Sequence, residues 1–362
     1  MVYELSTLGF GPFFEEQRQR WDEQNILPAR IAAEHRGAYE VWSSAGAGPA
    51  RLSGKLRHGQ EGEADGEGLP AVGDWVGLRE PPGPDHTTII DRLFARRTVF
   101  TRGAAGREAL AQIVAANVDV VFAVCGLDED FNLHRLERYL ARIWASGAVP
   151  AVVLNKADLC ADAFGRRQEV EARCADVPVH VTSALHADGL AAIRASISRG
   201  TTAAFVGSSG AGKSTLINAL MGEQRMATGE TRASDGRGCH ITTHRQLVLL
   251  PEGGLLLDTP GMRELQLLDD GGLDRVFDDI AESAAQCRFK DCRHEHEPGC
   301  AVKEAIAAGA LAAERLEHYQ KLEREAQAYE RRHDKRLKRQ SERVWGQLHD
   351  EAALLRKWKG GK

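Results

Sequence analysis

Two patterns of apolar residues divide the chain. From about residue 29 to residue 98, short runs that alternate apolar and polar positions are separated by glycine- and proline-rich breaks. Short strands at this spacing are typical of a small all-β barrel of about five strands, and we expect an OB-type barrel. A β-sandwich is the alternative on this pattern alone. The runs cover residues 30–35, 38–42, 50–56, 72–78 and 87–93.

After residue 112 the apolar runs become continuous. Residues 118–124 and 149–154 are almost wholly apolar, and a helical stretch at 133–146 separates them. Unbroken apolar strands that alternate with helices are typical of a mostly parallel sheet covered on both faces. We therefore predict a central α/β domain. Later runs of the same kind cover residues 177–181, 203–206, 247–250 and 255–257.

The two ends of the chain follow neither pattern. The leader before residue 27 is rich in aromatic residues, including Phe14 and Trp21, which can pack on the next domain or on a partner. After residue 271 the strands disappear, and helical stretches are expected at 301–313 and 315–348.

Composition narrows the class of protein. Of the 362 residues 43% are hydrophobic and 27% are charged, and the net charge is −5, so any contact with RNA must come from local basic patches. The sequence has neither a signal peptide nor a run of eighteen apolar residues, so we expect a cytoplasmic protein without membrane contact. We also expect it to be a monomer. Seven cysteines in such a protein indicate metal binding or burial rather than disulfides.

A phosphate-binding loop follows the run at 203–206. Residues 207–214 match G-x-x-x-x-G-K-[ST] between an apolar strand and a helix, which is the context that the motif requires. Lys213 is expected to bridge the β- and γ-phosphates, and the Ser214 hydroxyl to bind Mg²⁺. The phosphate-binding residues that we assign are Gly207, Ser208, Ser209, Gly210, Ala211, Gly212, Lys213, Ser214 and Thr215, with Gly261 from a later motif.

A guanine-reading motif ends the strand at 151–154. The Asp158 carboxylate can accept from N1–H and from the 2-amino group of guanine, a donor pair that adenine lacks. After the next strand the Ala184 amide is expected to donate to guanine O6. The predicted guanine-binding residues are Asn155, Lys156, Asp158, Ser183 and Ala184.

The order of these motifs is unusual. The guanine motif precedes the phosphate loop, whereas ordinary GTPases carry the phosphate loop first. The sequence therefore predicts a GTPase whose chain is circularly permuted.

The remaining GTPase motifs surround the γ-phosphate. Asp258 ends a strand and is expected to hold Mg²⁺ through water, while the Gly261 amide would meet the γ-phosphate. Met262 stands where many GTPases place a glutamine that orients water, and a thioether cannot do this. His240, which follows a segment at 228–238 rich in Gly, Ser, Asp and Arg, is the candidate catalytic group; the alternative is a loop histidine without a role. The predicted magnesium ligands are Ser214, Thr242 or Thr243, and Asp258.

A metal-like cluster lies beyond the GTPase motifs. Cys287, Cys292, His294 and Cys300 follow the pattern C-x4-C-x-H-x5-C, which fills all four places of one structural zinc site. His296 is a competing ligand, and reduced buried cysteines are the alternative.

Together these features resemble the ribosome small-subunit-dependent GTPase A family of bacteria. The resemblance rests on the motif order, the β-barrel, the G-x-H-x-T-T segment at 238–243 and the cysteine cluster, and it covers about residues 27–320. It implies a GTPase that binds GTP and GDP, Mg²⁺ and one zinc ion, and that acts on the small (30S) ribosomal subunit and its 16S rRNA during late maturation, stimulated by the subunit. The family's switch histidine corresponds to His240 and its zinc ligands to the cluster.

The resemblance has limits along the chain. The family usually has three threonines after the switch histidine, but Ile241 occupies the first place here. The basic run at 331–339 can lie along rRNA phosphates or form a solvated helix.

These observations predict a multidomain protein. Its expected parts are an N-terminal extension (1–26), an OB-fold β-barrel (27–98), a linker (99–112), a circularly permuted P-loop GTPase domain (113–270) and an α-helical zinc-binding domain (271–362). Two other functions stay open: a GTP-gated adaptor for RNA or protein in which hydrolysis is incidental, and a GTP-dependent metal-handling protein.

Overall fold

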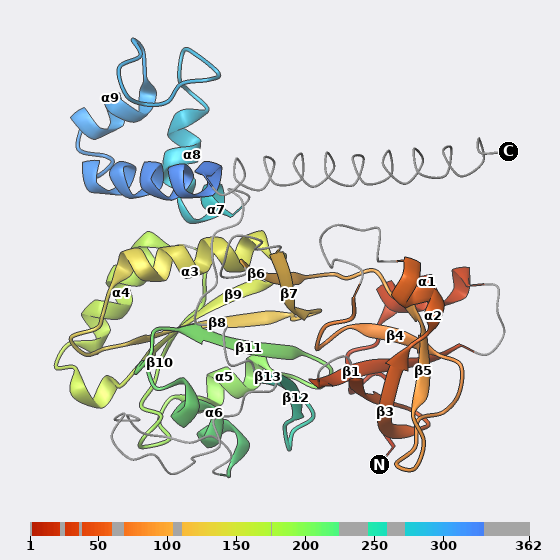
Figure 1. Cartoon of the computed structure of the whole chain (residues 1–362). Helices are drawn as coiled ribbons and strands as arrows, with labels where there is room; N and C mark the ends of the chain where they lie inside the picture. Colours follow the sequence, from red (N-terminus) through yellow and green to blue (C-terminus); the bar gives the residue numbers. More distant parts are fainter. Residues whose placement is uncertain are drawn as a thin grey trace, which may run out of the picture.

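The computed structural model of the chain describes residues 2–21, 26–35, 38–59, 69–103, 111–174, 176–223, 245–258 and 272–328. Along the chain these residues form a β-barrel, a mixed sheet flanked by helices, and a group of C-terminal helices (Figure 1). Within this described part, no helix is long and apolar enough to cross a membrane.

The barrel is closed, as the sequence predicted. Its strands pair in the order β1-β2-β3-β5-β4, and β4 returns to pair with β1, so that a sandwich of two separate sheets is ruled out. This order fits an OB-type barrel. Alternate residues such as Ile31, Val41 and Val76 fill its interior. The strands are β1 (Leu27–His35), β2 (Ala38–Ser43), β3 (Gly46–Leu52), β4 (Trp75–Leu78) and β5 (Thr88–Leu93).

One predicted strand is partly wrong. The run at 50–56 is a strand only as far as Leu52, and α2 (Gly54–Gly59) takes up its second half. The reason is local, because the Ser53 hydroxyl accepts from the Leu56 amide and so caps the helix start.

The α/β part contains a six-stranded section in the order β10-β9-β8-β11-β13-β12, in which only β12 is antiparallel to its neighbour β13. Each of the seven residues of β8 is buried, which explains the unbroken apolar run. The strands are β8 (Val120–Gly126), β9 (Val149–Asn155), β10 (Val179–Val181), β11 (Thr202–Gly207), β12 (Gln246–Leu249) and β13 (Leu255–Asp258).

Helices cover both faces of this sheet. Along β8, Val121 and Ala123 belong to the core under α3, whereas Phe122 and Val124 belong to the core over α5 and α6. Figure 1 shows the same two layers, with α3 and α4 on one face and α5 and α6 on the other. The helices are α3 (Leu133–Ala145), α4 (Ala163–Arg173), α5 (Leu190–Ser196) and α6 (Lys213–Met221), with the short 3-10 helix η1 (Ala157–Leu159).

The barrel and the α/β sheet are joined through β1. Ala33 of β1 pairs with Gln246 of β12, so the two sheets form one continuous hydrogen-bonded surface. The segment expected to be a linker contributes to this junction as well. It forms β6 (Val99–Gly103), which pairs antiparallel with β7 (Ala111–Ala116).

The leader packs on the barrel and on the α/β domain, which decides between the two options that the sequence left open. Phe14, in α1 (Pro12–Arg20), is buried against Trp75 and Phe94. Arg199, which precedes β11, donates to the Thr7 hydroxyl at 2.8 Å. The leader is therefore part of the folded core.

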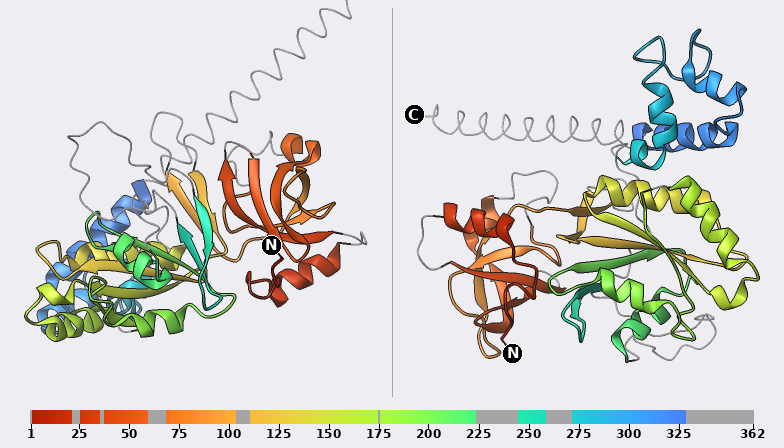
Figure 2. Two further views of the ribbon diagram at one scale, coloured as in Figure 1. Left: turned by 90° about the horizontal axis from the view of Figure 1, so that it is seen from below. Right: turned by 180° about the vertical axis from the view of Figure 1, so that it is seen from behind.

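The described C-terminal residues 272–328 contain helices and no strand. Figures 1 and 2 show these helices on the same side of the sheet as α3. They are α7 (Leu273–Val276), α8 (Asp278–Ala284), α9 (Ala301–Ala307) and a helical stretch at 313–328.

Candidate nucleotide site and metal centre

The phosphate loop has the shape that its glycines allow. Gly207, Gly210 and Gly212 all have positive φ, with values of 150°, 83° and 91°. A Cβ on Gly207 would lie 2.3 Å from the Val124 carbonyl oxygen, and one on Gly212 would lie 2.2 Å from Nδ2 of Asn155. These two positions therefore exclude a side chain by contact as well as by backbone conformation.

Lys213 begins α6 and folds back over the loop. Its ammonium donates to the carbonyl of Gly207 at 2.8 Å and to that of Ser208 at 2.5 Å. Ser214 and Thr215 follow in the first helical turn. The loop, a cation and a helix N-terminus thus converge at one end of β11, an arrangement suited to a bound phosphate group.

Asn155 holds three loops together. Its Nδ2 donates to the Ala211 carbonyl in the phosphate loop at 3.0 Å, and its Oδ1 accepts from the Thr182 hydroxyl at 3.2 Å. The Ala184 amide, which the sequence analysis directed at guanine O6, here donates to the same Oδ1 at 3.0 Å. Because Asn155 is buried, its main contacts are with protein. The motif spacing identified the residue but not these partners.

Asp158 is exposed at the mouth of the same loops. The Ser183 hydroxyl donates to its Oδ1 at 2.5 Å, and this hydrogen bond lowers the pKa of the carboxyl. The group is therefore an anionic acceptor at neutral pH, which is the state needed to accept from two guanine donors.

Two site residues were missed by sequence reasoning. Asp128 and Asp130 lie in the loop between β8 and α3. Asp128 accepts from the Lys156 ammonium at 2.5 Å, and Asp130 accepts from the Ser208 hydroxyl at 2.6 Å. The available signal was their place directly after a buried parallel strand, since polar groups at the carboxyl ends of such strands converge on one edge of the sheet.

The γ-phosphate motifs are only partly described. β13 runs parallel to β11 and ends at Asp258, as expected, so its backbone ends at the edge that carries the phosphate loop. The side chain of Asp258 and the predicted site residues His240, Thr242, Thr243 and Gly261 lie outside the described residues.

The cysteine cluster has the dimensions of a metal site. Sγ of Cys287 lies 3.9 Å from Sγ of Cys300, and Nδ1 of His294 lies 3.4 Å from Sγ of Cys300. All four ligand atoms, including Sγ of Cys292, lie within 4.8 Å of one another. A zinc ion bound tetrahedrally at about 2.3 Å from sulfur would separate two sulfurs by about 3.8 Å. The four residues can therefore hold one metal ion of this kind.

Comparison with known proteins identifies the family. A family model described as RsgA GTPase matches residues 93–268. A protein of Opitutus terrae, named Small ribosomal subunit biogenesis GTPase RsgA, is 46% identical over 354 residues, covering 95% of this chain and 96% of that protein. This chain belongs to the RsgA GTPase family. A relative of the same name from Syntrophotalea carbinolica is 41% identical and covers 95% of this chain and 98% of that protein.

Solved structures agree with this placement. The crystal structure of YjeQ from Thermotoga maritima has a TM-score of 0.63 and 26% identity, and covers 83% of this chain and 98% of that one. YloQ, described as a circularly permuted GTPase, has a TM-score of 0.62 at 24% identity and so supports the fold alone; it covers 85% of this chain and 97% of that one.

The permutation also shows in a second family match. A model described as 50S ribosome-binding GTPase matches residues 202–337, beginning at β11. An ordinary GTPase begins with its phosphate-loop strand, so such a model aligns only from that strand onward. This RsgA-family chain is a GTP-hydrolysing enzyme with permuted order, and the comparisons do not favour the adaptor and metal-handling alternatives.

A second group of possible metal ligands, His134, Glu137 and His318, is better explained as an ion network. Glu137 of α3 accepts from Arg315 at 2.9 Å and from His318 at 2.7 Å. Burial alone would raise the pKa of Glu137, but His318 and the neighbouring guanidinium groups hold it below its usual value. A carboxylate with these partners is already neutralised and joins α3 to the C-terminal helices.

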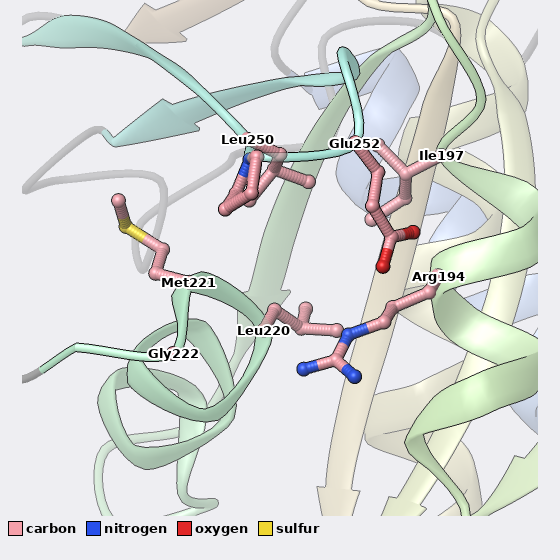
Figure 3. Close-up of a pocket in the computed structure, with 8 residues that line it drawn as sticks. Arg194, Ile197, Leu220, Met221, Gly222, Leu250 and Glu252 are labelled. Carbon is pink, nitrogen blue, oxygen red and sulfur yellow. The ribbon is translucent and has the colours of Figure 1, made fainter.

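One further cavity of about 150 Å³ lies at the other end of α6 from Lys213 (Figure 3). The Arg194 guanidinium beside it donates to the Ala219 carbonyl at 2.8 Å. The lining is mostly apolar, and its charged side chains are Arg194 and Glu252. The lining residues are Arg194, Ile197, Leu220, Met221, Gly222, Leu250, Pro251 and Glu252.

Proposed function

We propose that this GTPase acts in the biogenesis of the small ribosomal subunit: it binds the 30S particle late in maturation, and the particle stimulates its hydrolysis of GTP. The observation that carries the proposal is 46% identity over 95% of the chain to a relative named for this role. The geometry of the phosphate and base loops supports the GTP-binding part of this role.

The proposed roles in GTP binding follow from the two loops. The residues 207–215 and Gly261 bind the phosphates, with Lys213 as the cation that meets the β- and γ-phosphates. Asp158 reads guanine, supported by Ser183, while Lys156 borders the base. Asn155 acts mainly by holding the loops together. The Ala184 amide donates to Oδ1 of Asn155, so it can donate to guanine O6 only by sharing this hydrogen bond or giving it up.

The proposed magnesium and catalytic groups complete the site. Ser214, one of Thr242 and Thr243, and Asp258 would hold Mg²⁺, which neutralises charge that develops on the phosphates. His240 would position or deprotonate the attacking water, since Met262 cannot.

The C-terminal cluster would hold one structural zinc ion. With Cys287, Cys292, His294 and Cys300 as ligands no place remains for a bound water, so the ion stabilises the fold rather than taking part in hydrolysis. The proposed division of the chain is an OB-type barrel at 27–98, a GTPase domain at 113–270 and an α-helical zinc-binding domain from 271.

The proposed partner is the 16S rRNA of the particle, met by a monomer. With a net charge of −5 the enzyme depends on local basic patches for this contact. Assembling subunits are found in the cytoplasm, and this is where we place the activity.

GTP hydrolysis with and without purified small subunits tests the proposal. We expect a rate increase of about tenfold or more with small subunits, none with large subunits, and little turnover of ATP. A rate that small subunits leave unchanged would contradict the role while leaving the GTPase itself intact. His240→Ala should then remove the stimulated rate and keep GTP affinity.

A further inference from the structure

The loop between β8 and α3 contacts both halves of the nucleotide site. Asp128 reaches Lys156, which follows β9 in the base-reading motif, and Asp130 reaches Ser208 in the phosphate loop. Neither carboxylate belongs to a recognised GTPase motif of the sequence, yet each is bonded to a residue that does. Only Glu129 separates them in the chain.

Asp128 fixes an otherwise unfavourable residue. Lys156 has φ 64° and ψ 38°, a left-handed conformation that a residue with a long side chain rarely adopts. Its ammonium is tied to Oδ2 of Asp128 at 2.5 Å, and the two side chains are only 29% and 26% exposed. A charge-assisted hydrogen bond of this length stabilises the conformation of the base loop next to Asp158.

Asp130 acts on the phosphate loop through a short chain of contacts. It accepts from Ser208 at 2.6 Å, and the carbonyl of Ser208 accepts from the Lys213 ammonium at 2.5 Å. Arg135 of α3 pairs with Asp130 at 2.7 Å and neutralises its charge, so the carboxylate adds little repulsion toward a bound phosphate. Its main effect is to fix the peptide that holds Lys213.

We propose that Asp128 and Asp130 are positioning residues of the GTP site, Asp128 for the base-reading loop through Lys156 and Asp130 for the phosphate loop through Ser208. The inference rests on the proposed nucleotide site. The two carboxylates contact different halves of that site. Removing Asp128 should therefore affect recognition of the base, and removing Asp130 should affect binding of the phosphates.

Nucleotide discrimination separates the two roles. The full-length protein is titrated with GDP and with inosine diphosphate, which lacks the 2-amino group that Asp158 reads. Asp128→Ala should weaken GDP binding about fivefold or more, the scale of one lost charge-assisted hydrogen bond, and should reduce the preference for GDP over inosine diphosphate. Asp130→Ala should weaken binding of both nucleotides about threefold or more and leave the preference unchanged.

Partner variants show whether each carboxylate acts through its partner. Lys156→Ala should weaken GDP binding at least as much as Asp128→Ala, and Ser208→Ala at least as much as Asp130→Ala, because each partner also lies beside the nucleotide. Each double variant should bind no more weakly than the weaker-binding of its two single variants. Glu169→Ala, which removes an exposed carboxylate paired with Arg166 on α4, is the matched control and should bind both nucleotides normally.

The outcomes are distinct. A wild-type protein that fails to bind GDP would overturn the proposed site itself. Normal GDP binding by the wild type, with both aspartate variants within about twofold of it, would overturn the positioning roles. Fully additive double variants would do so as well, because the carboxylates would then act independently of Lys156 and Ser208. Asp128→Asn and Asp130→Asn repeat the test if either alanine variant fails to fold.

Discussion

The GTPase domain has two junctions, and they are built differently. On the barrel side, strand β1 pairs with β12, and the backbone amide of Ala116 donates to the Val72 carbonyl at 3.1 Å. On the C-terminal side, the polar contacts run through side chains: His134 meets Glu314, Glu137 meets Arg315 and His318, and Arg138 meets Glu325. Apolar residues support both junctions.

This difference indicates which of the two junctions can be opened by the loss of a charge. The backbone hydrogen bonds between β1 and β12 do not depend on ionised side chains, and Arg30, which also crosses this junction, donates to backbone carbonyls rather than to a carboxylate. The barrel and the GTPase sheet should therefore move as one body. A junction of ionised side chains depends on each group keeping its charge, and removing one partner leaves another charge buried. We therefore expect the C-terminal helices to separate from α3 under conditions that leave the barrel attached.

The largest effect should come from Arg30 at the barrel junction. Its side chain is 1% exposed and donates to the carbonyls of Leu8, Gly73 and Asn117, which come from the leader, the barrel and the GTPase domain. Arg30→Ala would remove the guanidinium donor from the Leu8 and Asn117 carbonyls and leave a cavity, while the Gly73 carbonyl would keep its bond from the Asn117 side-chain amide. It should lower the free energy of unfolding by about 4 kcal/mol. Urea denaturation measures this. The exposed Arg20→Ala should change it by less than about 0.5 kcal/mol.

Glu137→Gln should have the next largest effect, confined to the other junction. Loss of the charge leaves Arg315 with only the partly exposed Asp279 as a counter-ion, at a cost of about 3 kcal/mol. Hydrogen exchange should increase in residues 272–328 and stay unchanged in the barrel. Equal exchange in both regions would show that the two junctions do not differ as we describe.

Acid should act on the same junction. The pKa of Glu137 is lowered in the folded protein, because His318 and the neighbouring guanidinium groups outweigh its burial. Its stabilising contribution is therefore complete above the unfolded pKa of about 4.3 and is lost as the pH falls through the lower folded value. The stability difference between wild type and Glu137→Gln should shrink below about pH 4 in denaturation curves. A difference that stays constant from pH 7 to pH 3.5 would exclude this role of the charge.

The smallest effect should come from Glu325 at the edge of the junction. Glu325 and Arg138 pair at 2.8 Å, but their side chains are 38% and 30% exposed. Water and salt screen such a pair, so Glu325→Gln should cost less than about 1 kcal/mol, and the cost should vanish in about 1 M salt. A thermal melt at two salt concentrations checks both values.

Sequence alone was sufficient where the information was local. The seven buried residues of β8 appear as one apolar run, and the phosphate loop is defined by glycines whose backbone angles require them. The helix α2 was missed because a single Ser53 cap decides it against a strand-like run.

Contacts between distant residues left no such signal. Glu137 and Arg315 are 178 positions apart, and neither looks unusual among its neighbours in the sequence. In the same way the motif identified Asn155, but its bonds to Ala211 and Ala184 depend on how three loops meet in space.

Helix α3 brings these themes together. Arg135, which pairs with the Asp130 that holds the phosphate loop, is two residues from Glu137, which holds the C-terminal helices. Two residues of an α-helix are about 3 Å apart along the axis and roughly 200° apart around it. The two attachments thus lie on nearly opposite sides of the helix and within one helical turn of each other. A rotation of α3 about its own axis would displace the attachment to the phosphate loop and the attachment to the C-terminal helices at once and in opposite directions. The two attachments are therefore mechanically coupled through this helix.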